Sequence, residues 1–165
     1  MSWNPAGETR SMPSLLKGTA TVCLLGVILL TNSATANRQA GSSAHLPFAY
    51  AQYGCAPTDA LALDFYFTAN QSECGKISEP YVKISIWKNL PKSAPYSIEV
   101  RATEVGAIRC LRAGACEAAT SGSLHLEKFI DEKISAGEYE LHFRDGSVEK
   151  GSFDATWCHI RFVCG

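Results

Sequence analysis

Imidazole and carboxylate side chains recur at polar positions in the C-terminal half of the chain. His125, His142 and His159 each stand between apolar neighbours, and Glu140 lies two residues before His142. Side chains of these two types can bind a metal ion or transfer protons. We predict these four residues as a candidate metal-binding or acid–base set. We favour a simpler interpretation, a solvated sheet face with ordinary polar side chains, because no motif such as H-E-x-x-H supports the site.

Two aromatic residues suggest a different chemistry. Tyr66 and Trp87 fall at positions that alternate with apolar residues, where polar side chains are expected. Partly exposed aromatic rings can anchor a small ligand, a sugar or a partner protein. We therefore predict Tyr66 and Trp87 as candidate binding residues. The alternative is that both faces of these two segments are covered by other parts of the chain.

Motifs that would identify an enzyme or a nucleotide-binding protein are missing from the sequence. It contains no G-x-S-x-G elbow, no G-x-G-x-x-G and no phosphate-binding loop. We assign no catalytic residue and predict no cofactor. The formal net charge of the whole chain is −1, without the clustered Lys and Arg that a nucleic acid or an anionic membrane surface would require.

The first residues have the pattern of an export signal. A short apolar run, 18–31, follows Lys17, and Ser33-Ala34-Thr35-Ala36 ends the segment with small residues. The run is shorter than the roughly 20 apolar residues that a membrane-spanning helix needs. We predict a signal peptide over 1–36 and a secreted or periplasmic location, with a retained anchor as the alternative.

Six cysteines follow the predicted signal: Cys55, Cys74, Cys110, Cys116, Cys158 and Cys164. An even number in an exported chain indicates disulfides. The segment 158–164 is rich in β-branched and aromatic residues, so we predict one strand, about 20 Å long. A disulfide joins Cα atoms only roughly 4.4–6.8 Å apart, so Cys158 and Cys164 should not pair with each other.

A local bridge is expected between Cys110 and Cys116, because Gly114 permits the chain to reverse between them. Cys55 and Cys74 must then pair with the two C-terminal cysteines, in an order that the sequence leaves open. A metal site formed by these cysteines is disfavoured, because none of them has zinc-ligand spacing.

The elements that carry these residues are strands. Apolar and polar residues alternate over 61–68, 82–87, 97–101, 124–127, 138–144 and 152–157. Asp145-Gly146 indicates a hairpin turn. We predict an all-β antiparallel sandwich of immunoglobulin-like architecture, or a small barrel, with seven to nine strands over 55–165. Residues 37–54 are assigned to a linker or N-terminal arm, and the segment 126–135 is a candidate for a short helical connector.

These observations favour an exported, non-catalytic binding or interaction module. Its expected partner is another extracellular or periplasmic protein or a small ligand, with no nucleic acid and no membrane after signal cleavage. The alternative is a secreted hydrolase or metal-binding protein that uses the histidine and carboxylate residues. A sandwich supports many unrelated functions, so the fold alone does not decide between them.

Overall fold

The structure is a computed structural model that describes residues 46–101, 103–112 and 114–165. The predicted signal peptide and residues 37–45 of the predicted linker lie outside the described residues. Within the described ranges, no helix is long and apolar enough to cross a membrane.

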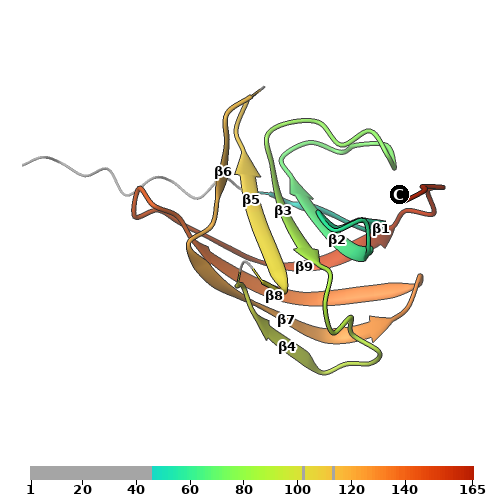
Figure 1. Ribbon diagram of the computed structural model, residues 1–165. Coiled ribbons are helices and arrows are strands. Elements are labelled where there is room, and N and C mark those ends of the chain that lie inside the picture. Colours follow the sequence, from blue (N-terminus) through green and yellow to red (C-terminus); the bar gives the residue numbers. More distant parts are fainter. Residues whose placement is uncertain (1–45, 102, 113) are drawn as a thin grey trace, which may run out of the picture. The chain divides into compact units, whose positions relative to one another are not determined.

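Nine strands and no helix make up the described part of the chain (Figure 1). The strands are β1 Phe48–Cys55, β2 Leu61–Thr68, β3 Tyr81–Ile86, β4 Tyr96–Glu99, β5 Val105–Cys110, β6 Cys116–Ala118, β7 Ser121–Ile130, β8 Ile134–His142 and β9 Val148–Trp157. They form one sheet in the order β4-β7-β8-β9-β1-β2-β3-β5-β6. The all-β prediction is therefore confirmed.

The sheet is mixed rather than wholly antiparallel. β1 runs parallel to β9 through two residue pairs, Tyr50 with Thr156 and Ala51 with Trp157, while every other neighbouring pair is antiparallel. This parallel contact joins two antiparallel halves, and the sheet curls into a half-barrel (Figure 1). The parallel pair corrects the prediction, because a period of two reveals a strand but not the direction of its neighbour.

The core lies between the two halves of the curled sheet. Leu63, Phe65 and Phe67 of β2 are almost fully buried, as their alternation in the sequence predicts. Phe67 stacks on Tyr139 of β8 with a centroid distance of 4.1 Å, and Phe65 lies 5.6 Å from Phe153 of β9. Offset aromatic contacts of this kind add to the stability gained by burying apolar area.

The folded domain begins before Cys55, contrary to the predicted boundary. Residues 48–54 form most of β1, which lies at the centre of the sheet between β2 and β9. Four consecutive residues of this strand, 49–52, are buried, so both of its faces are covered. A strand covered on both faces loses the alternation by which the others were identified.

Two further local predictions are wrong. The segment 126–135 is not a helical connector, because it forms the end of β7, a turn and the start of β8. Glu132 in that turn has a φ of 55°, which suits a tight reversal. The segment 158–164 is not a strand: β9 ends at Trp157, and the remaining residues pair with no other strand.

Three disulfides close the domain. Cys110 pairs with Cys116 across β5 and β6, as predicted. The order that the sequence left open is Cys55 with Cys164 and Cys74 with Cys158. Cys158 and Cys164 do not pair with each other, although the strand on which that exclusion was based is absent. The last residues are therefore held by two bridges and by the backbone N–H of Cys158, which donates to the carbonyl of Ala51 on β1 at 2.8 Å.

The Asp145-Gly146 turn joins β8 to β9, as the sequence predicts, and it is fixed by a small polar cluster. Ser147 donates its backbone N–H (2.9 Å) and its hydroxyl (2.6 Å) to one carboxylate oxygen of Asp145. Arg109 donates to the other carboxylate oxygen at 2.7 Å. These hydrogen bonds, those from Ser147 first, lower the pKa of Asp145 to about 2.

This shift predicts a pH-dependent effect of Asp145→Asn. A depressed folded pKa means that the carboxylate stabilises the fold above about pH 4, and that this contribution is lost as the pH falls towards about 2. The variant should therefore unfold at lower urea concentration than the parent at pH 7 but at the same concentration near pH 2. Asp154→Asn, at an exposed position on β9, is the control. An equal difference at both pH values would contradict the assignment.

Candidate functional site

The outer face of β4, β7, β8 and β9 carries two of the predicted histidines. The Nδ1 atom of His125 lies 2.6 Å from the hydroxyl of Ser97, its cross-strand neighbour on β4. The Nε2 atom of His142 lies 2.9 Å from a carboxylate oxygen of Glu140 on the same strand. His125 and Glu140 both line a shallow polar depression of about 550 Å³. This outer face is called the histidine face below.

The four predicted metal or acid–base residues do not meet at one centre. His125 lies opposite Glu138, whereas Glu140 lies opposite Ser123. His159 is in the C-terminal segment, 3.8 Å from Glu132, and lines a different depression with Tyr53 and Trp157. Of the four, only Glu140 and His142 lie within ion-pair distance of each other, both about half exposed, while His125 shares a depression with Glu140.

One group of possible metal ligands lies elsewhere. Among the described residues, only Glu79, Cys110 and Cys116 place three such ligand atoms within 4.8 Å of one another. Both cysteines are joined in a disulfide, so neither offers a thiolate, which is the form that binds metal. This group carries no candidate site in the oxidised protein.

A second depression, of about 370 Å³, lies on the outer face of β3 and β5. Its walls come from these two strands and from the turn that follows β1. The lining residues are Cys55, Ala56, Pro57, Lys83, Ser85, Trp87, Gly106 and Ile108. Trp87 is partly exposed here, as expected for a candidate binding residue. We call this feature the Trp87 depression.

The register of β3 and β5 explains how the indole is placed. Ser85 pairs with Gly106, and the backbone N–H of Trp87 donates to the carbonyl of Glu104. A Cβ atom at position 106 would lie 2.8 Å from Cη2 of Trp87, closer than such contacts occur. Glycine at this position therefore lets the ring lie against the sheet instead of projecting into water.

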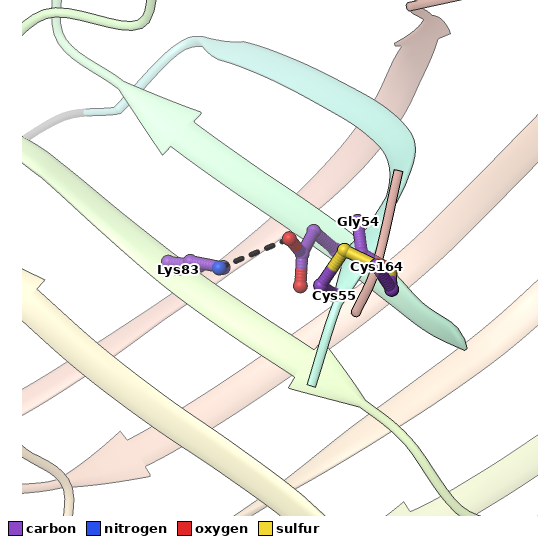
Figure 2. The surroundings of a disulfide bond; sticks show 5 residues. Gly54, Cys55, Lys83 and Cys164 are labelled. Atoms are coloured by element: carbon purple, nitrogen blue, oxygen red, sulfur yellow. Dashed lines mark hydrogen bonds and ion pairs between the residues drawn. A yellow bond between two sulfur atoms is a disulfide. The ribbon is translucent and has the colours of Figure 1, made fainter. Parts of the chain in front are cut away.

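An ion pair forms the polar end of the Trp87 depression. The ammonium of Lys83 lies 2.9 Å from a carboxylate oxygen of Asp64 on β2, whose side chain is only 3% exposed. Figure 2 shows Lys83 extending from its strand towards this carboxylate, beside Gly54 and the Cys55–Cys164 bridge. Burial alone would lower the pKa of Lys83, but the Asp64 carboxylate and the Tyr66 hydroxyl together outweigh it and raise this pKa. Lys83 is therefore held as a cation.

Tyr66 is not part of the depression. Its ring contacts Tyr81 edge to face at 5.7 Å, and the Lys83 ammonium lies 5.3 Å from the ring centroid. Burial raises the pKa of Tyr66, which keeps the hydroxyl protonated at neutral pH. Of the two predicted binding residues, Trp87 lines the depression, whereas Tyr66 packs beside the Lys83–Asp64 pair.

Sequence reasoning missed most of the other lining residues. Two of them carry a signal in the sequence. Lys83 and Ser85 lie four and two residues before Trp87, and a strand places residues two apart on the same face, so their common face could have been recognised. Gly106 has no such signal, because its place under the indole depends on the pairing of β3 with β5. In comparisons with known proteins, the chain matched no family model, no curated protein and no solved structure.

Proposed function

We propose that this protein is an exported, non-catalytic binding module that holds a small ligand in the Trp87 depression. The observation that carries the proposal is an aromatic ring, partly exposed and backed by glycine, in a depression that also offers a hydroxyl and an ammonium group. Ligand sites typically combine apolar walls with a few placed polar groups in this way. The rest of the domain serves as a rigid support, with the two facing halves of the sheet acting as the layers of a sandwich.

Export is the second part of the proposal. Three intramolecular disulfides favour an oxidising compartment outside the cytoplasm. In this proposal, the signal peptide predicted over 1–36 directs the chain out of the cytoplasm. Without cytosolic reductants, the bridge from Cys55 to Cys164 keeps the turn at one wall of the depression in place.

The alternative function, a secreted hydrolase or metal-binding protein, stays a prediction for the histidine face. Its strongest support is the contact of His142 with Glu140 and of His125 with Ser97. We place the ligand site at Trp87 instead, because these two contacts belong to separate pairs on a solvated surface. Zinc titration of the purified protein, followed by calorimetry, tests the metal-binding alternative. No heat of binding at micromolar protein would count against it.

Trp87→Ala should weaken ligand binding strongly while leaving the fold intact. Protein labelled with 5-fluorotryptophan is screened by ¹⁹F NMR against small organic fragments, including carboxylic acids, amines, aromatic compounds and neutral polyols. Hits should move the Trp87 resonance, which is assigned by its loss in the variant, and not that of the buried Trp157. An aromatic anchor commonly contributes at least about 2 kcal/mol, so the affinity of Trp87→Ala for each hit, measured by calorimetry, should fall about thirtyfold or more.

Phe162→Ala is the control for this experiment, because it removes another partly exposed aromatic ring that lines a different depression. It should leave the affinity of every hit unchanged. Fragments that bind equally well to Trp87→Ala and the parent would contradict the proposed site.

A further inference from the structure

The chemical class of the ligand can be inferred from the charges around the Trp87 depression. The inference rests on the proposed function, because it names what would bind at that site. Of the described residues lining the depression, Lys83 alone is charged, and its ammonium is 2.9 Å from Asp64. The pair is neutral as a unit. An anionic ligand would compete with a buried carboxylate for the same cation, and a cationic ligand would be repelled by Lys83, so the site favours a neutral ligand.

The polar groups favour a ligand that carries hydroxyls. A lysine ammonium has three N–H donors, so its contacts with the Asp64 carboxylate and the Tyr66 hydroxyl leave one donor for a neutral oxygen. Ser85 is the cross-strand partner of Asp64, and its hydroxyl can both donate and accept a hydrogen bond. A purely apolar ligand would leave these groups without water and without a replacement partner, which is costly.

The remaining lining requires an apolar surface on the same ligand. Trp87, Ile108 and Pro57 supply apolar walls. A pyranose sugar has this combination, because its ring C–H groups form an apolar face and its hydroxyls project from the edge. The volume of about 370 Å³ lies near the small end of the roughly 300–1,000 Å³ that is usual for ligand sites. We propose that the Trp87 depression binds a neutral pyranose sugar, with the ring on the indole and the hydroxyls towards Ser85 and Lys83.

Three sugars of similar shape but different charge test this proposal. The full chain, produced with its disulfides formed and with 5-fluorotryptophan, is titrated with methyl β-glucopyranoside, with the corresponding glucuronate and with the corresponding glucosamine glycoside. Methyl β-galactopyranoside and methyl N-acetyl-β-glucosaminide extend the neutral series. The neutral sugars should move the Trp87 resonance, and the two charged sugars should bind about tenfold more weakly. Equal or tighter binding of a charged sugar would overturn the proposal.

Two variants locate the sugar. Gly106→Ala places a Cβ atom against the indole and should displace it, which weakens sugar binding about tenfold or more without removing any polar group. Ser85→Ala should weaken binding about tenfold by removing a hydroxyl and nothing else. Thermal melting shows whether each variant is folded. If Gly106→Ala does not fold, Ser85→Ala alone tests the proposal. Unchanged affinity in Ser85→Ala would contradict the orientation that we propose.

The results also separate this inference from the proposed function. If the fragments move the Trp87 resonance but no neutral sugar does, the sugar proposal is wrong and the binding site stands. If neither fragments nor sugars move that resonance, both are wrong.

Discussion

Replacing all four cysteines of the two long-range disulfides should leave the protein unfolded at 25 °C. Cys55–Cys164 and Cys74–Cys158 join residues 109 and 84 positions apart. In the chain-entropy account, a bridge closing a loop of about 100 residues stabilises the fold by about 4.7 kcal/mol. The combined effect is smaller than twice this value, because the Cys74–Cys158 loop lies inside the Cys55–Cys164 loop.

Because one loop lies inside the other, the stability that each bridge contributes depends on whether the other bridge is present. With Cys74–Cys158 intact, the outer bridge closes an effective loop of only about 25 residues, so its own contribution is about 3.5 kcal/mol. Loss of the inner bridge afterwards costs about 4.6 kcal/mol more. The sum of about 8 kcal/mol lies within the 5–15 kcal/mol that stabilises a typical domain. Removing the outer bridge alone should therefore weaken the fold, whereas removing both should abolish it.

Circular dichroism and urea unfolding of the alanine variants measure these steps. The Cys55→Ala/Cys164→Ala protein should unfold cooperatively with its free energy of unfolding lowered by about 3.5 kcal/mol, and the quadruple variant should show no transition. Cys110→Ala/Cys116→Ala is the matched control, because its bridge spans only 6 positions and should contribute about 2 kcal/mol. A quadruple variant that retains a cooperative transition would show that sheet pairing and the aromatic core suffice without the bridges.

Those features of the fold that depend on local pattern could be predicted from the sequence. The alternation around Phe65 and Phe67 reports which side chains face the core, because successive residues of a strand point to opposite faces. The Asp145-Gly146 turn and the Cys110–Cys116 bridge are also local. β1 escaped prediction because residues 49–52 are buried without alternation, and only its long-range pairing with β2 and β9 defines it as a strand.

The candidate site depends on pairing between distant strands, which sequence periodicity does not report. Trp87 could be recognised as an aromatic residue at a polar position, but Gly106 acquires its role only when β5 pairs with β3, with β4 lying elsewhere in the sheet. The histidines show the same difficulty. His125 and Glu140 are residue types that can bind a metal, and alternation places both on the outer face of their strands. The register of β7 with β8 nevertheless places Glu138, not Glu140, opposite His125.

Replacing Lys83 by methionine should lower the free energy of unfolding by about 3–5 kcal/mol, because it leaves the buried Asp64 carboxylate without its cation. Asp64 is 3% exposed, and its second carboxylate oxygen has no hydrogen-bond partner. Asp64→Asn should cost less, since the Lys83 side chain, 23% exposed, can turn its ammonium towards water. The double variant should recover much of the loss, because a neutral pair carries no uncompensated charge.

Urea unfolding of the two single variants and the double variant measures the coupling directly. Lys76→Met is a matched control: Lys76 and Glu73 form an ion pair at 2.8 Å, but their side chains are 78% and 77% exposed. Solvent screens that pair, so its loss should cost less than about 1 kcal/mol. The distances of the two pairs are nearly equal, so a large difference between the lysine variants isolates the effect of burial. If Lys83→Met were no more destabilising than Lys76→Met, Asp64 would be reaching water. The ion pair could then no longer account for a neutral Trp87 depression.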